Sequence, residues 1–326
     1  MGRVEKDIFI HSLIEVAGLS EAGMRLSAFI NLFENDWDLI KDFILDRFWL
    51  QLFKYESDFC GGNTKKESRS EIPKGKGIFN YKDLINEHKL IYDFYNVKIT
   101  DFYREDDFEY DINDKLQYLI DRQAVFIGTK VKCKKCGSNK WYSYAELNSI
   151  IACKGCGSMI TPQMETPIYY KLSEVITRNI LSDLTKNSKD FDGNYTVLNA
   201  LLWLKNDIRN CSQSFLYSPS MEYRTKKGRK SDIDILAIQD GRLVLGEAKN
   251  CASEFNRNEM EALAWLGNNV KPDKLILAYN EGKISEQRII QLKSMLEVEC
   301  EILEYKVEKT TYSFRGVFGQ PSKITK

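Results

Sequence analysis

The chain has 326 residues, and its 47 Lys and Arg residues balance its 47 Asp and Glu residues, so the formal net charge is zero. This balance excludes a globally basic nucleic-acid-binding protein, and any surface for nucleic acid must be local. The sequence is 43% apolar and has no run of 18 apolar residues, which excludes a membrane span. The N-terminus lacks the layout of a signal peptide, so we expect a cytoplasmic protein. The length predicts about two or three compact units.

The first part of the chain, residues 1–125, is predicted to be an all-helical domain. Apolar residues recur at helical spacing over 26–33 and again over 37–53. A Gly-, Ser- and charge-rich passage predicts a loop at 57–78, and further helices are expected at 81–96 and 112–122. The aromatic content of the first helices allows two interpretations, a packed bundle or a face that docks the substrate or a protein partner.

Two Cys-x-x-Cys pairs follow, and they predict a zinc site. Cys133 and Cys136 form the first pair, and Cys153 and Cys156 form the second. This spacing is typical of a four-cysteine zinc ribbon, because each tight turn presents two thiolates and the two turns complete a tetrahedron. Four thiolates leave no position for water, so the Zn²⁺ is expected to be structural. We assign the ribbon to residues 126–168.

Other residues of the ribbon suggest how it is built and what it contacts. Gly137 and Gly157 follow the second cysteine of each pair and suit the positive φ that such turns often need. Basic and aromatic residues nearby can contact phosphates and stack on bases, namely Lys134, Lys135, Lys140, Lys154, Trp141, Tyr142 and Tyr144. The alternative is a rigid spacer that packs these aromatic residues against a neighbouring domain.

Residues 169–326 are predicted to form an α/β domain, because helical and strand-like apolar patterns alternate along them. Helices are expected at 172–184, 193–207, 255–268 and 284–296, and strands at 215–223, 231–237, 242–249, 274–279 and 300–307. The second and third strands form a predicted hairpin, since Gln239-Asp240-Gly241 between them has turn chemistry.

Charged residues interrupt both strands of this hairpin. Asp232 and Asp234 share one face of the first strand, and Glu247 and Lys249 share one face of the second, because side chains alternate along a strand. Carboxylates and an amine among Ile, Leu and Val are costly to bury unless they hold a metal or each other. The pattern therefore indicates a metal site or, alternatively, an ion pair at a sheet edge.

The set of Asp234, Glu247 and Lys249, together with the order of the predicted helices and strands around it, resembles the PD-(D/E)xK nuclease superfamily. This superfamily has the restriction-endonuclease-like fold. The resemblance covers roughly the last 150 residues and implies an α-β-β-β-α-β core. The chain departs from the signature because Ser231, and no Pro, precedes the acidic pair. The position of the acid along the strand leaves Asp232 or Asp234 as the ligand, and the family spacing favours Asp234.

The resemblance implies phosphodiester hydrolysis with Mg²⁺ or Mn²⁺. Asp234 and Glu247 would bind the ion, since magnesium prefers carboxylate oxygens, and the carbonyl of Ala248 would be a third ligand. Lys249 would orient the attacking water, counter developing charge or accept a proton. Glu222 on the preceding strand is a further catalytic candidate that takes a second metal or orients a water, or else is an exposed hairpin glutamate.

A local basic cluster lies between Glu222 and Asp232. Five of the seven residues at 224–230 are basic, namely Arg224, Lys226, Lys227, Arg229 and Lys230. Charge runs in loops are usually solvated, but beside an acidic site this cluster favours contact with phosphates.

The resemblance, together with these patterns, implies a metal-dependent endo- or exonuclease in a restriction or phage-defence system, with DNA as the expected substrate. Its α/β domain at 169–326 would have a restriction-endonuclease-like core, preceded by the ribbon at 126–168 and the helical domain at 1–125. The alternative is a catalytically inactive protein that binds nucleic acid through the ribbon, or recruits a partner through the N-terminal helices, on a nuclease scaffold.

Overall fold

The computed structural model describes residues 14–44, 78–82, 84–86, 107–162, 167–176, 194–205, 214–225, 230–307, 313–315 and 321–323. The chain divides into two compact units. The first unit comprises 1–38 and 178–309, and the second comprises 39–177 and 310–326. These bounds differ from the predicted division at 125 and 168, because the start of the chain joins the C-terminal α/β region. The predicted loop at 57–78 falls almost wholly outside the described residues.

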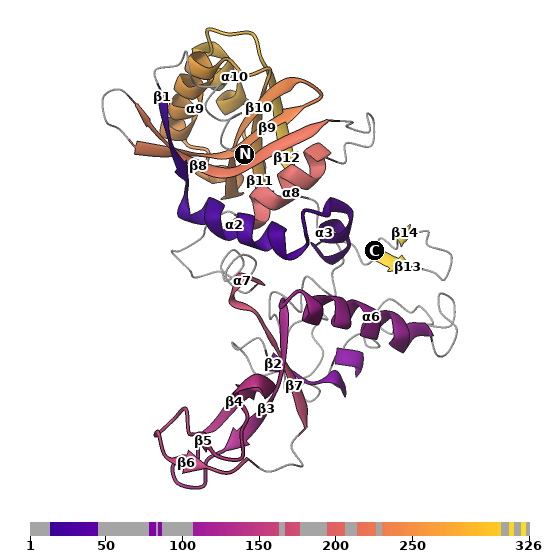
Figure 1. Ribbon diagram of the computed structural model, residues 1–326. Helices are drawn as coiled ribbons and strands as arrows, with labels where there is room; N and C mark the ends of the chain where they lie inside the picture. Colours follow the sequence, from indigo (N-terminus) through magenta and orange to yellow (C-terminus); the bar gives the residue numbers. More distant parts are fainter. Residues whose placement is uncertain are drawn as a thin grey trace. The chain divides into compact units, whose positions relative to one another are not determined.

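The first unit is built on a six-stranded mixed sheet with the strand order β1-β8-β9-β10-β11-β12 (Figure 1). Successive neighbours from β1 to β10 are antiparallel, and β11 and β12 then add in parallel. The strands are β1 (Ile14–Leu19), β8 (Phe215–Thr225), β9 (Lys230–Gln239), β10 (Arg242–Cys251), β11 (Lys274–Glu281) and β12 (Glu301–Lys306). The predicted hairpin and last two strands are therefore confirmed as strands.

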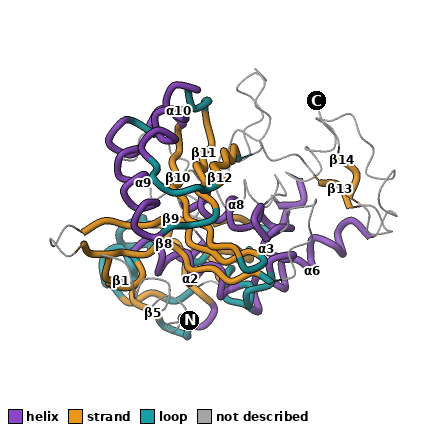
Figure 2. Tube along the Cα trace, turned by 90° about the horizontal axis from the view of Figure 1, so that it is seen from above, coloured by secondary structure: helices purple, strands orange, loops and turns teal. Residues whose placement is uncertain are grey.

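Helices cover both faces of this sheet (Figure 2). One face packs against α8 (Asn194–Lys205), which also contacts α2 (Glu21–Leu32). The other face packs against α9 (Arg257–Val270) and α10 (Glu286–Met295). Helices α8, α9 and α10 lie within about two residues of their predicted positions, within the usual uncertainty of helix ends.

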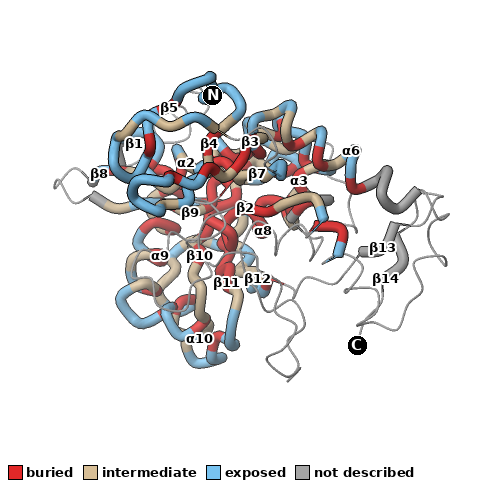
Figure 3. The backbone as a smooth tube through the Cα atoms, turned by 90° about the horizontal axis from the view of Figure 1, so that it is seen from below, coloured by how far each residue is buried: buried red, intermediate tan, exposed pale blue. Residues whose placement is uncertain are grey.

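One part of the core of the first unit lies between the sheet and helix α9. Leu245, Leu275 and Leu277 project from the strands toward Met260 and Leu263 of the helix, and all five side chains are buried. Figure 3 shows the buried middle of β10 and β11. Strands that are buried on both faces contain nearly continuous apolar runs, as the five buried residues of 275–279 do.

The prediction that residues 1–125 are all helical is wrong at its start. Residues Ile14–Leu19 form β1, which pairs antiparallel with β8 from Ile14 opposite Thr225 to Leu19 opposite Met221. A bulge interrupts the ladder between Val16 and Gly18, where Gly18 has a φ of 133°. The strand forms because a partner some 200 residues away supplies its hydrogen bonds, which local periodicity cannot show.

The helices predicted after β1 form over 21–32 and 37–44, while residues 45–53 of the second stretch lie outside the described residues. Ser20 caps α2 by accepting a hydrogen bond from the Gly23 amide, and α3 (Trp37–Ile44) follows. Leu26, Phe29 and Ile30 are fully buried. These residues therefore stabilise the unit and are not exposed for docking a partner.

The second unit contains a four-stranded antiparallel sheet with the order β2-β7-β3-β4 and a separate two-stranded ladder of β5 and β6. These strands are β2 (Ile78–Phe79), β3 (Val125–Lys132), β4 (Asn139–Ser143), β5 (Ile151–Ala152), β6 (Met159–Ile160) and β7 (Ile168–Leu172). A further ladder joins β13 (Ser313–Arg315) to β14 (Pro321–Lys323).

The helices of this unit agree with prediction in part. Helix α6 (Asp107–Asp121) matches the helix expected at 112–122. The helix expected at 172–184 is wrong at its start, because Leu172 ends β7 and helix α7 (Glu174–Ile176) begins later. Among the described residues, no helix has the length and apolar character needed to cross a membrane.

Candidate acidic site and cysteine cluster

The acidic site lies where strands β9 and β10 part. The two strands pair from Gln239 opposite Arg242 to Ile235 opposite Gly246, and their ladder ends there. Beyond this point residues 230–233 pair with β8, and residues 247–251 pair with β11. The sheet therefore forks between β9 and β10. A fork in a sheet leaves backbone amides without strand partners, and side chains must satisfy them.

Asp234 and Glu247 occupy the first positions beyond this fork, and Lys249 lies two residues after Glu247. Leu236 and Leu245 form a cross-strand pair, so they share a face of the sheet. Asp234 lies two residues before Leu236, and Glu247 and Lys249 lie two and four residues after Leu245. Alternation therefore places all three charged side chains on this face, which is the face covered by α9. The structure brings the three predicted residues together.

The Asp234 carboxylate replaces the missing strand contact. Its Oδ2 accepts a hydrogen bond from the Ala248 amide at 3.0 Å, and its Oδ1 accepts one from Ser220 Oγ at 3.4 Å. Ser220 is buried, and its Oγ lies 2.9 Å from Ser20 Oγ, which also caps α2. A row of polar side chains therefore runs from Ser20 at the end of β1 through Ser220 to Asp234.

Lys249 forms ion pairs with two glutamates. Its Nζ lies 2.6 Å from Glu247 Oε1 and 3.4 Å from Glu259 Oε2. Glu259 belongs to the first turn of α9, which begins after Asn256, whose side chain accepts hydrogen bonds from the amides of Asn258 and Glu259. The Glu247 and Lys249 side chains are only 18% and 21% exposed, so water screens their attraction weakly.

Burial shifts the titration of both carboxyl groups. It raises the pKa of Asp234 to about 6, and the neighbouring Asp232 carboxylate adds to the shift. Burial, followed by the Asp234 carboxylate, raises the pKa of Glu247 well above its usual range. For Lys249, burial opposes the ammonium, but the Glu247 carboxylate outweighs it and the pKa of Lys249 is raised. Two crowded acids held beside one amine are a suitable environment for a divalent cation.

Glu222 and Asp232 lie farther along β8 and β9, where their neighbours Met221, Tyr223 and Ile233 pack into the core beneath α9. They are opposite each other in the ladder of β8 and β9, and the Met221–Ile233 pair separates them from Ser220 and Asp234. Asp232 is exposed and Glu222 is half-buried. Within the described residues, the four cysteines are the one group of three or more potential ligands whose atoms all lie within 4.8 Å of one another. The acidic site is smaller, because it contains only two carboxylates close to each other among the described residues, those of Asp234 and Glu247.

Part of the predicted basic cluster falls in the β8–β9 hairpin. Arg224 is exposed and lies opposite Lys230 in the ladder. Four residues of strand separate Lys230 from Asp234, which corresponds to about 13 Å. Lys226, Lys227 and Arg229 lie outside the described residues.

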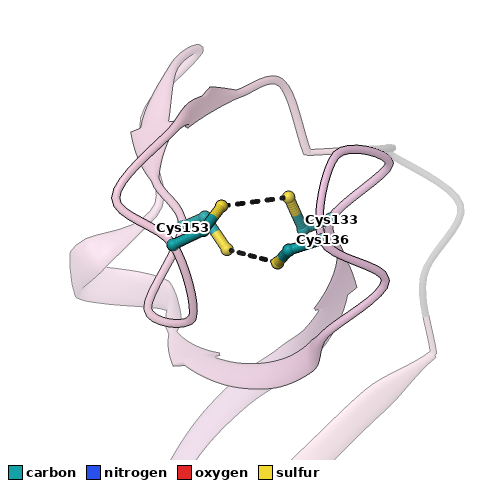
Figure 4. A group of neighbouring side chains, drawn as sticks. Cys133, Cys136 and Cys153 are labelled. Carbon is teal, nitrogen blue, oxygen red and sulfur yellow. Dashed lines mark hydrogen bonds between the residues drawn. The ribbon is translucent and has the colours of Figure 1, made fainter.

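The four predicted cysteine ligands gather between two facing loops (Figure 4). The Sγ atoms of Cys133 and Cys156 are 3.9 Å apart, and those of Cys136 and Cys153 are 3.7 Å apart. Four sulfurs placed tetrahedrally about 2.3 Å from a zinc ion would be separated by about 3.8 Å. The cluster therefore has the dimensions needed to hold a metal ion such as zinc.

The two cysteine loops have the same backbone geometry. The Gly137 amide donates to the Cys133 carbonyl and the Gly157 amide to the Cys153 carbonyl, both at 2.8 Å. Gly137 and Gly157 have φ values of 72° and 73°, which confirms the positive φ expected there. The Ser138 hydroxyl lowers the pKa of the Cys153 thiol to about 6, which favours the thiolate that metals bind.

Hydrogen bonds and a lysine hold the loop at 153–156 against β4. The Tyr142 hydroxyl accepts from the Lys154 amide at 2.7 Å and lies 3.2 Å from the Ala152 carbonyl, and the ring is buried. Lys154 Nζ lies 2.8 Å from Glu146 Oε1. The interpretation of Tyr142 as a base-stacking residue is therefore wrong, since this ring belongs to the small core beside the cysteines.

Sequence reasoning missed Ser20, Ser220 and Glu259. Glu259 lies three residues after Asn256, the N-cap of α9, and this spacing is a helix-start signal that the sequence contains. Ser20 shows a similar capping signal, but only the pairing of β1 with β8 places it beside Ser220. No sequence pattern identifies Ser220 as a partner of Asp234.

Comparison with known proteins leaves this chain without a family. No protein-family model matches the sequence, and no curated protein matches it. Among solved structures, protein VC1899 from Vibrio cholerae is similar with a TM-score of 0.27 and 10% sequence identity, over 89% of this chain. The match spans 54% of the VC1899 chain, about half its length. A similarity this low assigns neither fold nor function.

Proposed function

We propose that the chain is a divalent-metal-dependent nuclease that hydrolyses phosphodiester bonds, with DNA as the expected substrate. The observation that carries the proposal is the fork between β9 and β10, where Asp234, Glu247 and Lys249 meet on one face of the sheet. The order α8-β8-β9-β10-α9-β11 supports it, because the PD-(D/E)xK resemblance implies an α-β-β-β-α-β core. Two acids and a lysine at a break in such a sheet are what the resemblance implies for catalysis.

Each residue has a role that its contacts support. Asp234 and Glu247 would hold Mg²⁺ or Mn²⁺, with the Ala248 carbonyl as a further oxygen, and the ion would supply charge neutralisation and a more acidic water. The Ala248 amide and Ser220 orient the Asp234 carboxylate. Lys249 has a raised pKa and is an ammonium at neutral pH, which favours orienting water or countering charge over accepting a proton.

We also propose that the cysteine cluster holds a structural Zn²⁺. Four thiolates leave no coordination position for a substrate, and the small core of Val131, Tyr142 and Ile151 is too small to fold such hairpins alone. The described cysteines are free thiols, which fits the reducing cytoplasm where we place the protein. Restriction or phage defence is the setting in which we expect this nuclease to act.

A cleavage assay on the full chain tests the nuclease proposal. Plasmid, linear duplex and single-stranded DNA, and RNA, are incubated with the protein and Mg²⁺ or Mn²⁺. Asp234→Ala and Lys249→Ala are expected to abolish cutting, because the first removes a metal ligand and the second removes the cation beside it. The matched control is Asp232→Ala, an exposed acid two residues from Asp234, which is expected to retain cutting.

The assay has two outcomes that contradict the assignment. Cutting that survives both Asp234→Ala and Lys249→Ala would show that another site, or a contaminant, performs the reaction. Cutting that is lost with Asp232→Ala and retained with Asp234→Ala would move the metal ligand to Asp232, the other acid that the sequence allowed.

A second candidate function is nucleic-acid binding without catalysis. The observation that favours it is the Lys249 ion pair, because Glu247 and Glu259 already neutralise the amine without a metal. In this case the protein would bind nucleic acid with a steep salt dependence and without any requirement for divalent ions. Binding measured with and without Mg²⁺, beside the cleavage assay, separates the two candidates.

A further inference from the structure

One face of the four-stranded sheet in the second unit combines lysines with aromatic rings. Strand pairing places Lys130 opposite Trp141 across β3 and β4, and Phe126 opposite Lys171 across β3 and β7. Residues that are directly opposite share a face, and alternate residues along a strand share it too. We call this face the aromatic–lysine platform, and its residues are Phe126, Lys130, Lys132, Trp141, Tyr169 and Lys171.

Trp141 lies flat on the platform. A Cβ atom added to Gly128 would be 2.6 Å from Cζ2 of the Trp141 ring, so the indole rests on the backbone where a side chain is missing. Its Nε1 donates a hydrogen bond to the Tyr169 carbonyl at 3.4 Å. The ring is therefore fixed against β3 and β7, and Trp141 is half-buried. A fixed aromatic ring loses little entropy when a partner stacks on it.

Lysine ammonium groups surround the rings of the platform. Lys130 Nζ lies 4.2 Å from the centroid of the Tyr169 ring, and Lys171 Nζ lies 5.3 Å from that of Trp141. The platform contains three lysines, Lys130, Lys132 and Lys171, and no acidic residue, although the whole chain is neutral. Phe126 at the edge of the platform is 38% exposed. The platform is therefore locally basic and partly apolar.

We propose that the aromatic–lysine platform binds single-stranded nucleic acid, with bases stacked on Trp141 and Tyr169 and phosphates beside Lys130, Lys132 and Lys171. Stacking on aromatic rings requires bases that are not stacked inside a duplex. The lysines that now lie over the rings are long and flexible, so they can move to phosphates. The platform's use in holding substrate rests on the proposed nuclease function, but its binding of a single strand does not.

Fluorescence anisotropy of the full chain tests the platform. Labelled single-stranded DNA, single-stranded RNA of the same sequence and the matching DNA duplex are titrated without divalent ions, so that no cutting occurs. We expect both single strands to bind more tightly than the duplex. Trp141→Ala should weaken single-strand binding by about tenfold, since stacking of one base is worth roughly 1–3 kcal/mol, and Trp141→Phe should keep most of it.

The lysines are tested through the salt dependence of binding. Lys130→Ala and Lys171→Ala should each lower the slope of log affinity against log salt by about 0.7, the value for one phosphate contact on a single strand. Lys140→Ala is the matched control, because Lys140, a candidate phosphate contact in the sequence, is exposed and precedes Trp141, so it lies on the opposite face of β4, away from the platform. Metal content and circular dichroism show whether each variant is folded.

Several results would overturn the platform. One is an equal loss of affinity in Lys140→Ala and Lys130→Ala. Another is equal binding of duplex and single-stranded nucleic acid, and a third is unchanged single-strand binding by Trp141→Ala. If Trp141→Ala fails to fold, Lys130→Glu and Lys171→Glu on their own decide the question. Single-strand binding by a protein that does not cut would support the platform proposal and contradict the proposed nuclease function. Cutting together with normal single-strand binding by Trp141→Ala would reject the platform alone.

Discussion

The cysteine cluster has the dimensions of a metal site, and the acidic site is proposed as one, but the two are assembled in different ways. All four cysteines come from two adjacent hairpins within residues 133–156, and their sulfurs have the spacing of a tetrahedral site. The acidic site uses side chains from β8, β9, β10 and α9, and Ser20 extends it to the end of β1. The first site is local and offers four ligands. The second is distributed along the chain, and an amine compensates part of its charge.

This difference in assembly predicts what removal of the proposed metal ion from each site would do. In the cysteine cluster, two short loops surround a core of only three buried residues, so we expect the loops to need the ion in order to fold. In the acidic site, Lys249 partly neutralises Glu247, and the surrounding strands are held by their own ladders. We therefore expect loss of the first metal to unfold part of the chain. Loss of the second should affect activity and pH dependence while the fold persists.

The largest effect is expected from Cys153→Ser. This variant should lose its bound zinc and the structure of the β5–β6 hairpin, because structural zinc contributes on the order of 10 kcal/mol to folding of such units. Elemental analysis and thermal unfolding measure the two losses. Cys300→Ser is the control, since Cys300 lies on the other compact unit, and it should keep the zinc. A Cys153→Ser protein with full zinc content would show that the cluster is not the zinc site.

An intermediate effect is expected from the pH dependence of Asp234. Its pKa is about 6 in the folded state against an ordinary value of 3.8, so between these pH values the folded state holds a proton that the unfolded state has released. Without divalent ions, the free energy of unfolding should fall as pH rises through this window, by at most about 3 kcal/mol from this group. Denaturation at several pH values between pH 4 and pH 8 measures the change.

Magnesium and a matched variant sharpen this test. In the proposed function Mg²⁺ would bind the ionised carboxylates, so it should raise stability at pH 8 and have little effect at pH 5, where Asp234 is protonated. Asp234→Asn keeps an oxygen for the Ala248 amide and has no charge to titrate, so its stability should change less with pH. If Mg²⁺ stabilises the Asn variant as strongly as the parent protein, the ion binds elsewhere.

The smallest effect is expected from Ser220→Ala. Loss of the hydroxyl removes one hydrogen bond to Asp234 Oδ1, at a cost of about 1 kcal/mol, and should weaken the apparent affinity for Mg²⁺ by several-fold. Titration of cleavage activity against Mg²⁺ concentration measures it. Ser218→Ala is the control, because Ser218 lies two residues away on the same strand and its hydroxyl contacts the Pro219 carbonyl. Equal shifts in the two variants would assign the effect to β8 as a whole.

The sequence predicts what local patterns determine. Cysteine spacing located the cluster, and alternating apolar residues located the hairpin that contains Asp234, Glu247 and Lys249. It did not predict β1, whose six residues form a strand only because β8 pairs with them. Tyr142 was wrongly placed among base-stacking residues because composition does not show which rings are buried. The fork that brings the charged residues together depends on where two ladders end, and this is a tertiary property.

The strand at the start of the chain has a practical consequence for anyone who trims this protein to its proposed nuclease region. β1 covers the outer side of β8, whose eleven residues would otherwise present a long row of bare amide and carbonyl groups to other molecules. A fragment that begins at residue 169 would lack this cover and also the hydroxyl of Ser20 beside Ser220. Such a fragment is expected to self-associate through β8, and fusions at the N-terminus would lie close in sequence to this edge.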